Sequence, residues 1–272
     1  VTSLDIQTLE PCLKKALSAM ERLEQGEFCN ADENRQVGHY WLRNPDISPS
    51  KECKDLINEQ ISKVEAFAKS IIEEDLTSPS GKPFTDILWI GIGGSSLGPV
   101  LMLESLGKTG NNIKFHFLDN VDPIGMEKTF DEIGDDIKTT LFVVVSKSGS
   151  TPEPRLGMQE SMKRLERYQL KWNQQAIAIT MKGSILDRLA LEQNWITTFD
   201  MPDWVGGRTS ITSSVGLLPG ALSGADIRSF LSGAANMDQR TRNKDFQENP
   251  ACLLAAAWFS TGNGSGSRDM VL

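Results

Sequence analysis

A cluster of hydroxyl side chains with one lysine follows an apolar stretch near the middle of the chain. The cluster consists of Ser146, Lys147, Ser148, Gly149, Ser150 and Thr151. Hydroxyls and backbone N–H groups donate hydrogen bonds, and the lysine adds a compact positive charge. These residue types indicate a site for a phosphate monoester. The alternative is a serine-rich turn with one capping residue, and this stretch alone leaves both interpretations open.

The residues on either side place this cluster between a strand and a helix. Residues 141–145 form an apolar run, which is typical of a strand buried on both faces of a parallel sheet. Pro152 suits the first turn of a helix, and Glu153 suits its positive end. Open α/β sheets bind ligands at the carboxyl ends of their strands, and helix N-termini attract anions. The expected position of the cluster therefore favours the phosphate interpretation.

A glycine-rich turn, GIGGSSLG at residues 91–98, follows an earlier apolar stretch and opens a helical one. Glycines permit positive φ angles and a close approach of the backbone to a ligand. The dinucleotide pattern G-x-G-x-x-G is only partly met, because Ser96 occupies the third glycine position, although Asp119 ends the next strand as a ribose-binding acid would. Three interpretations stay open: a nucleotide site, a second turn presenting Ser95 to the same phosphorylated ligand, or a tight turn that needs small residues.

A third stretch, DWVGGRTSITS at residues 203–213, carries an arginine directly after two glycines. Gly206 and Gly207 allow the backbone and the guanidinium of Arg208 to approach a ligand closely. A fixed cation in such a place can stabilise a developing oxyanion. The alternative is a structural ion pair between Arg208 and a nearby aspartate.

Strand and helix patterns alternate around these stretches from residue 84 onward. Strands are expected at 87–92, 113–118, 141–145, 176–180 and 195–199. Helices are expected at 97–106, 125–133, 152–167 and 184–192. Short strands with room for a crossover helix between them predict βαβ units, and hence an α/β fold with a doubly wound parallel sheet.

The first 76 residues instead predict an N-terminal helical extension. Apolar residues recur there at three- and four-residue spacing, as Leu9, Leu13 and Ala16 do, and a second amphipathic helix is expected near residues 56–72. We therefore expect a helical segment at 1–76, the sheet domain at 77–230, and the start of a second half at 231–272. The composition of residues 262–267, GNGSGS, predicts a flexible loop.

Composition narrows the class of protein. The net charge of −8 and a chain without a Lys/Arg block argue against a nucleic-acid partner. The four cysteines form no CxxC pair and the chain holds only two histidines, which predicts free thiols in the cytoplasm and no His-rich metal centre. No apolar run reaches membrane-span length, and the first residues lack a signal-peptide pattern. The chain starts with Val and ends on apolar residues, so we expect a fragment.

The three stretches, in this order, resemble the glucose-6-phosphate isomerase (phosphoglucose isomerase) family, in its bacterial form. GIGGSSLGP at 91–99 is similar to the family's first sugar-phosphate turn, and SKSGSTPE at 146–153 to the phosphate loop of sugar isomerase (SIS) domains. DWVGGRTSITSSVG at 203–216 resembles a long and specific family signature, with Thr209 where many members have an aromatic residue. The similarity runs through most of the chain and includes VGHYWLRNP near its start.

The resemblance implies a flavodoxin-like SIS fold and an aldose–ketose isomerase that interconverts glucose 6-phosphate and fructose 6-phosphate in glycolysis and gluconeogenesis. A proton would move between C2 and C1 through a cis-enediol, without a metal or an organic cofactor. Arg208 would be catalytic and stabilise the enediolate. The residues that the resemblance assigns to substrate binding are Gly94, Ser95, Ser146, Lys147, Ser148, Gly149, Ser150, Thr151 and Gly207.

One departure from the family is large. The family's catalytic glutamate, ring-opening histidine and late lysine belong to motifs downstream of those matched here, as does the second SIS domain. We therefore expect negligible isomerase activity from this chain alone. The resemblance also implies a homodimer. Two other functions stay open: a non-catalytic phosphosugar sensor, which would not need Arg208, and a nucleotide-dependent oxidoreductase, which Ser96 disfavours.

Overall fold

The computed structural model describes residues 3–107, 113–262, 264–265 and 267–268. It divides into two compact units: a helical unit, which contains the residues up to Lys51 and those from Arg228 onward, and a sheet unit from Glu52 to Ile227. The start and the end of the chain share one unit. The division at 1–76, 77–230 and 231–272 itself stays a prediction.

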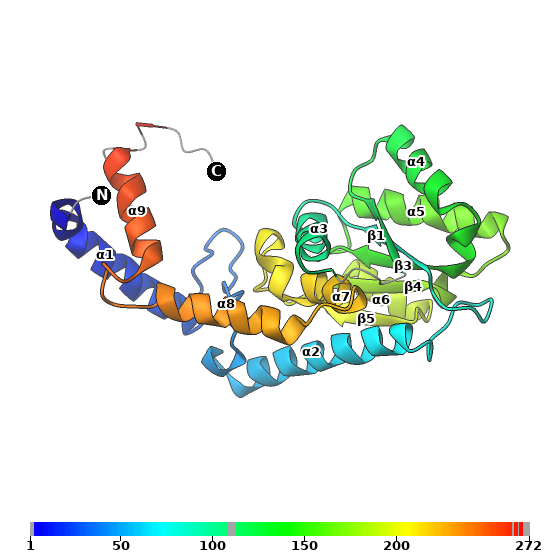
Figure 1. The fold of residues 1–272 in the computed structure, drawn as a ribbon, viewed down its shortest axis with the longest axis horizontal. Helices are drawn as coiled ribbons and strands as arrows, with labels where there is room; N and C mark the ends of the chain where they lie inside the picture. The colour runs from blue at the N-terminus through cyan, green and yellow to red at the C-terminus, as the bar shows by residue number, and fades with distance from the viewer. Residues whose placement is uncertain (1–2, 108–112, 263, 266, 269–272) are drawn as a thin grey trace. The chain divides into compact units, whose positions relative to one another are not determined.

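The sheet unit is built on a five-stranded parallel sheet in the order β2-β1-β3-β4-β5 (Figure 1). The strands are β1 Asp86–Ile90, β2 Lys114–Leu118, β3 Thr140–Val145, β4 Ala176–Thr180 and β5 Thr197–Asp200. All five expected strands are confirmed. This order is the flavodoxin-like one, in which the chain runs from β1 to one edge and from β3 to the other. The carboxyl ends of β1 and β3 therefore flank the topological switch point.

Burial explains why the three central strands read as continuous apolar runs. Every residue of β1, β3 and β4 is buried, whereas the edge strands β2 and β5 are partly exposed. A parallel sheet is covered by helices on both faces, so alternation of polar and apolar residues is lost in its centre. The doubly wound α/β fold expected from the sequence is confirmed.

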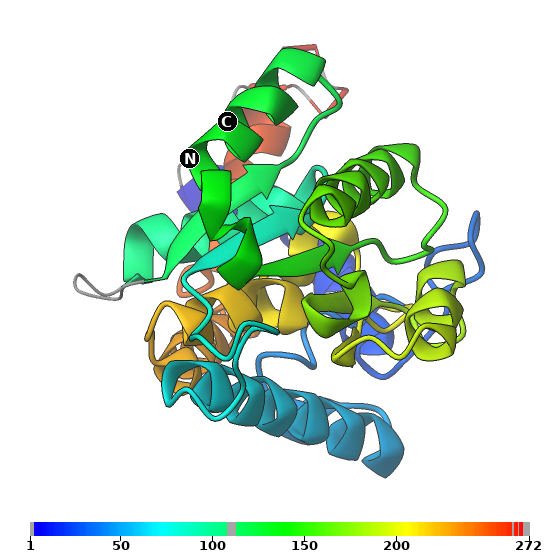
Figure 2. The same cartoon turned by 90° about the vertical axis from the view of Figure 1, so that its right-hand side faces the viewer.

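Helices cover both faces of the sheet (Figures 1 and 2). The crossover helices are α3 Gly94–Leu106, α4 Pro123–Ile133, α5 Pro152–Arg167 and α6 Ile185–Glu192. The helices α4, α5 and α6 share one core with the sheet, in which Phe130, Met158 and Leu186 contact inward residues of the strands. On the other face α2 (Lys51–Ile72) packs Phe67 edge-on against Phe199, with ring centroids 5.5 Å apart.

The starts of α5 and α3 agree to different degrees with the starts expected from the sequence. The expected start of α5 at Pro152 is confirmed, since proline at the first helical position loses no hydrogen bond. The helix expected at 97–106 begins three residues earlier, at Gly94, with Gly93 as its N-cap residue at a φ of +59°. Glycines weaken a helical pattern in a sequence, so the first turn was not visible there. Further along, α7 (Ser214–Leu222) packs against α3.

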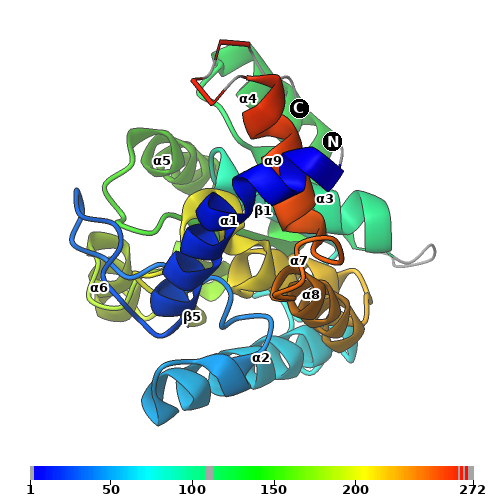
Figure 3. The same cartoon turned by 90° about the vertical axis from the view of Figure 1, so that its left-hand side faces the viewer.

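The helical unit contains α1 Ser3–Glu24, most of α8 Ile227–Thr241, and α9 Pro250–Thr261. Figure 3 shows α1 crossing α9. Two ion pairs hold this unit together: Arg43, which follows α1 in the chain, has its Nη1 2.5 Å from Asp238 Oδ1 on α8, and Arg242, directly after α8, has its Nη2 2.8 Å from Glu24 Oε1 at the end of α1. Part of the loop expected at 262–267 lies outside the described residues. No helix in the described parts of the chain is both long and apolar enough to span a bilayer.

Acidic pH is expected to weaken the helical unit through His39. Burial lowers the pKa of His39 from 6.5 to about 4. The charge of Arg43 adds to this shift, whereas the charge of Asp238 opposes it. Between these values the unfolded chain binds a proton more readily than the folded chain, so the stability contributed by neutral His39 is complete above pH 6.5 and is lost toward pH 4. Urea unfolding at pH 7 and pH 4.5 checks this. The wild-type chain should lose more stability than His39→Gln, and equal losses would contradict the prediction.

Candidate functional site

Three loops lie at the carboxyl ends of the strands around the switch point. The first joins β1 to α3, the second joins β3 to α5, and the third follows β5 and continues into a short 3-10 helix, Gly207–Thr212. These are the three stretches that the sequence singled out. Because parallel strands end at the same edge, the fold brings together segments that are far apart in the chain.

The β3–α5 loop is ordered by its own hydrogen bonds and by its neighbours. Ser146 Oγ accepts a hydrogen bond from the Gly149 N–H at 3.2 Å, and the hydroxyls of Ser148 and Ser150 lie 2.8 Å apart. Gly149 has a φ of +72°, and a side chain there would overlap the backbone of Leu186 at the start of α6. Only glycine fits this position, which fixes the path of the loop.

Thr151 does not serve the capping role that the alternative interpretation requires. It is the N-cap residue of α5, but its side chain makes no capping hydrogen bond. Pro152 and Pro154 occupy the first and third positions of the helix and carry no N–H. The helix end therefore offers few donors of its own, and an anion here would depend on the hydroxyls and N–H groups of the loop.

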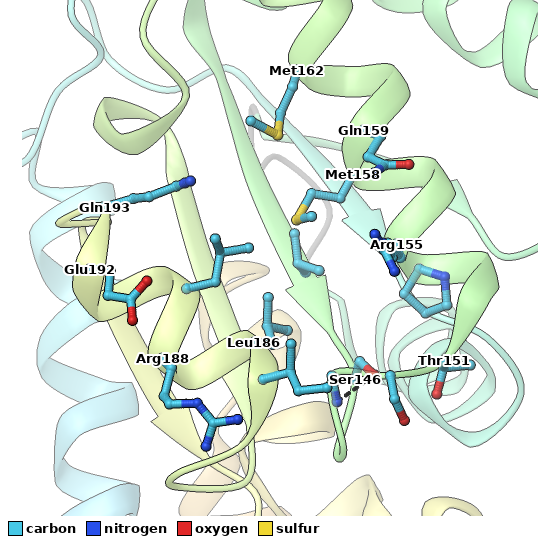
Figure 4. Close-up of a pocket in the computed structure, with 16 residues that line it drawn as sticks. Ser146, Thr151, Arg155, Met158, Gln159, Met162, Leu186, Arg188, Glu192 and Gln193 are labelled. Atoms are coloured by element: carbon cyan, nitrogen blue, oxygen red, sulfur yellow. Dashed lines mark hydrogen bonds between the residues drawn. The ribbon is translucent and has the colours of Figure 1, made fainter.

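A cavity of about 630 Å³ opens beside this loop, between α5 and α6 (Figure 4). Ser146, Gly149, Ser150 and Thr151 line one end of it. Its remaining wall carries the apolar residues Met158, Met162, Leu186 and Leu189, together with the charged residues Arg155, Arg188 and Glu192. Gly94, Ser95, Gly207 and Arg208 do not line the cavity, so it reaches only one side of the loop.

The glycines of the first and third loops bring their backbones into direct contact. A side chain on Gly94 would overlap the carbonyl oxygen of Gly207. Ser210 Oγ donates to the Gly207 carbonyl at 2.8 Å and lies 3.4 Å from the Gly94 carbonyl. Trp89 Nε1 donates to the Ser95 carbonyl at 2.7 Å. The structure therefore places Gly94 directly beside Gly207 and Arg208, and the assignment of these residues to a substrate site stays a prediction.

The Arg208 guanidinium lies against the turn after β1. A Cβ atom on Gly93 would come 2.5 Å from Arg208 Nη1, so the absent side chain of Gly93 makes room for the guanidinium. Within the part of the chain that the structure describes, Arg208 has no ion pair or hydrogen bond from its side chain, and it is exposed. The alternative of a structural ion pair with a nearby aspartate is therefore not seen. The cation is available to a ligand at this turn.

Lys147 extends toward the third loop. Its ammonium donates to the carbonyl oxygen of Val205 at 2.9 Å and to that of Asp203, and it lies 3.7 Å from the Asp203 carboxylate. The sequence pattern did not predict this contact between two residues that are 58 positions apart. Asp203, Val205 and Gly93 belong to the stretches that the sequence singled out, but sequence reasoning assigned none of them a role of its own.

Ser96, which occupies the third glycine position of the nucleotide pattern, has a local structural role. Its side chain is buried and donates to the Gly93 carbonyl at 3.1 Å. A serine thus closes the first turn of α3. Among the residues that the structure describes, no three His, Cys, Asp or Glu side chains gather as a metal site would require.

These features define a doubly wound α/β protein whose polar loops converge on the switch point of a flavodoxin-like sheet. A family model described as phosphoglucose isomerase matches residues 7–271. The chain belongs to this family, and the resemblance carried by the three motifs is confirmed.

Similar proteins agree with the family. The chain is 52% identical over 272 residues to the glucose-6-phosphate isomerase of Prochlorococcus marinus strain MIT 9211, covering 100% of this chain and 51% of the relative. It is 54% identical over 267 residues to that of Parasynechococcus marenigrum strain WH8102, covering 98% and 48%. A crystal structure of a glucose-6-phosphate isomerase from Chlamydia trachomatis matches with a TM-score of 0.83 at 27% identity, covering 98% of this chain and 52% of that one. The chain spans about half the length of the curated relatives it matches.

Proposed function

We propose that this chain forms the phosphosugar-binding half of an aldose–ketose isomerase that interconverts glucose 6-phosphate and fructose 6-phosphate. The observation that carries the proposal is the exposed Arg208 guanidinium, which lies beside the turn of Gly93 and Gly94 without a protein partner among the described residues. A fixed cation next to a ligand-facing turn suits a reaction that develops negative charge on an oxygen. An enediolate intermediate develops that charge.

The proposed roles divide between the loops. The phosphate is held by hydroxyl and N–H groups of residues 146–151, with Gly94 and Ser95 contributing from the turn after β1. Arg208 stabilises the enediolate, and Gly207 permits its approach. The uncommitted hydroxyl of Thr151 supports this assignment, because a residue placed only to cap α5 would use it.

The proton transfer itself needs a general base within reach of C1 and C2. We assign that base to no residue of this chain, since the family's glutamate, histidine and lysine motifs are not contained in its sequence. We further propose that the complete enzyme is a cytoplasmic homodimer. The extended enzyme, meaning a polypeptide in which this chain is followed by the second half that its relatives possess, would then carry the activity.

A phosphosugar sensor without catalysis is the second candidate. The available guanidinium of Arg208 argues against it, since binding alone does not need a cation at the reacting carbons. A nucleotide-dependent oxidoreductase is the third candidate. The buried, bonded Ser96 argues against that, because the third glycine of the nucleotide pattern serves close helix–strand packing.

Calorimetric titration tests the phosphosugar proposal. We expect fructose 6-phosphate to bind and free fructose not to bind, because a charge-assisted hydrogen bond contributes about 1.5–3 kcal/mol. Thr151→Val should weaken binding about tenfold, whereas Thr129→Val, whose hydroxyl bonds within α4, should not. Stabilisation by NAD but not by the phosphosugar would favour the oxidoreductase. The proposal is wrong if neither this chain nor the extended enzyme binds fructose 6-phosphate.

A further inference from the structure

We infer that Lys147 is a positioning residue, which ties the phosphate loop to the segment that presents Arg208. The inference rests on the proposed function and deepens it. The obvious role for a lysine in a phosphate loop is that of a point charge on the ligand. The geometry of its ammonium points to a different one.

The ammonium of Lys147 is directed at backbone carbonyls of the third loop. It donates to the carbonyls of Asp203 and Val205, the latter at 2.9 Å, and the Asp203 carboxylate lies 3.7 Å away. Two of the three N–H donors of the ammonium are thus used by backbone carbonyls, and the nearby carboxylate offsets its charge. The side chain is only 21% exposed, although the loop around it is open. Its charge is therefore compensated within the protein.

Both ends of this connection are anchored. The Lys147 carbonyl accepts from the Met181 N–H at 3.0 Å, which holds the base of the side chain at the end of β4. At the other end, Val205 is fully buried and its N–H donates to the Pro202 carbonyl at 3.0 Å. A side chain fixed at both ends transmits a displacement of one loop to the other.

A connection at Val205 matters for the position of Arg208 because of the segment that lies between these two residues. Gly206 and Gly207 follow the tethered residue, and a side chain on Gly207 would meet nothing within 4 Å. Glycines restrict the backbone least of all residues, so the direction of Arg208 depends on what holds the segment on either side. Ser210 holds it from one side through the Gly207 carbonyl, and Lys147 holds it from the other.

The tether and a direct phosphate contact lead to opposite expectations. If Lys147 positions Arg208, its loss lowers kcat and leaves the affinity for inorganic phosphate nearly unchanged. If Lys147 binds the phosphate, its loss weakens inorganic phosphate about tenfold or more. Measuring both kcat and the inhibition constant of inorganic phosphate on the extended enzyme therefore distinguishes the two interpretations.

The experiment compares Lys147→Met, Lys147→Arg and Arg208→Met, alone and combined. We expect Lys147→Met to lower kcat about tenfold, with the phosphate inhibition constant changed less than about twofold, and Lys147→Arg to restore most of the activity because it keeps the donors. When Arg208→Met is already present, adding Lys147→Met should lower kcat little further, since both substitutions act through the Arg208 guanidinium. Lys163→Met, an exposed lysine on α5, is the matched control.

A tenfold loss of phosphate affinity, or losses in kcat that multiply in the double variant, would overturn the inference. Asp203→Asn keeps the inference testable if Lys147→Met does not fold, because Asp203 is 49% exposed. A tether made through the backbone carbonyls predicts unchanged phosphate affinity for this variant, whereas a phosphate-binding lysine freed from its carboxylate predicts tighter phosphate binding. If the unaltered extended enzyme neither isomerises nor binds the phosphosugar, the proposed function itself fails, which is a distinct result.

Discussion

Replacing Arg208 by methionine is expected to lower the kcat of the extended enzyme by about 10²–10³-fold, the usual cost of removing one group that stabilises a developing oxyanion. The KM for fructose 6-phosphate should change by less than about threefold, because the enediolate charge exists only on the path to the transition state. A coupled assay of fructose 6-phosphate turnover measures both constants.

The structure provides the reason to expect so large an effect. The guanidinium lies at the turn after β1, where Gly93 leaves room for it, and it has no ion-pair partner among the described residues. Removing it should therefore break no ion pair, and little stability should be lost. Urea unfolding of the variant should resemble that of the wild type, which separates a catalytic defect from a folding defect.

Arg167→Met serves as the matched control. Arg167 is an exposed arginine in the last turn of α5, far along the helix from the loop. Its replacement should leave kcat and KM within about twofold, as most surface substitutions do. A rise in KM alone for Arg208→Met would make Arg208 a substrate-binding residue and contradict its catalytic assignment.

Replacing Gly94 by alanine is expected to destabilise the sheet unit by about 1–3 kcal/mol, the usual cost of inserting a methyl group into a packed site. The added Cβ would overlap the carbonyl oxygen of Gly207, and backbone atoms cannot move aside as a flexible side chain can. The third loop would be pushed away from the turn, and with it Arg208. Isomerase activity should fall at least about a hundredfold in consequence.

Urea unfolding and the coupled assay test this prediction together. Gly98→Ala is the matched control, because it makes the same change in the same helix but brings the new Cβ to 3.4 Å from Ile211 Cβ, an ordinary contact. It should fold and react like the wild type. If Gly94→Ala behaved like Gly98→Ala, the contact between the first and third loops would not be needed for the site.

Much of the fold was predictable because its signals are local. The helix at 152–167 and the strand at 176–180 were expected with the ends that α5 and β4 have, since proline marks the helix start and an apolar run marks the strand. The parallel sheet followed from the spacing of such runs. The three candidate stretches were identified in the same way, from glycines, hydroxyls and one arginine grouped after strands.

The contacts between these stretches were not predictable, because they join residues that are distant in the chain. Strand order decides that the loops after β1 and β3 flank the switch point, and apolar runs and turn residues do not specify that order, which only the family resemblance implied. The same holds for Gly94, whose close contact with Gly207 depends on a packing of two backbones across the site. The helical unit, in which the start of the chain packs with α8 and α9, likewise depends on long-range contacts.

The sequence by itself determined which chemical groups the candidate site contains: hydroxyls at 146–151, a glycine turn at 91–98, and Arg208 after two glycines. Only the tertiary structure decided how they act on one another. It left Arg208 without a protein partner among the described residues and directed the Lys147 ammonium to the carbonyls of Asp203 and Val205. The physical reason is that residue type fixes the available charge and donors, whereas their targets depend on distances set by the packing of strands and loops far apart in the chain.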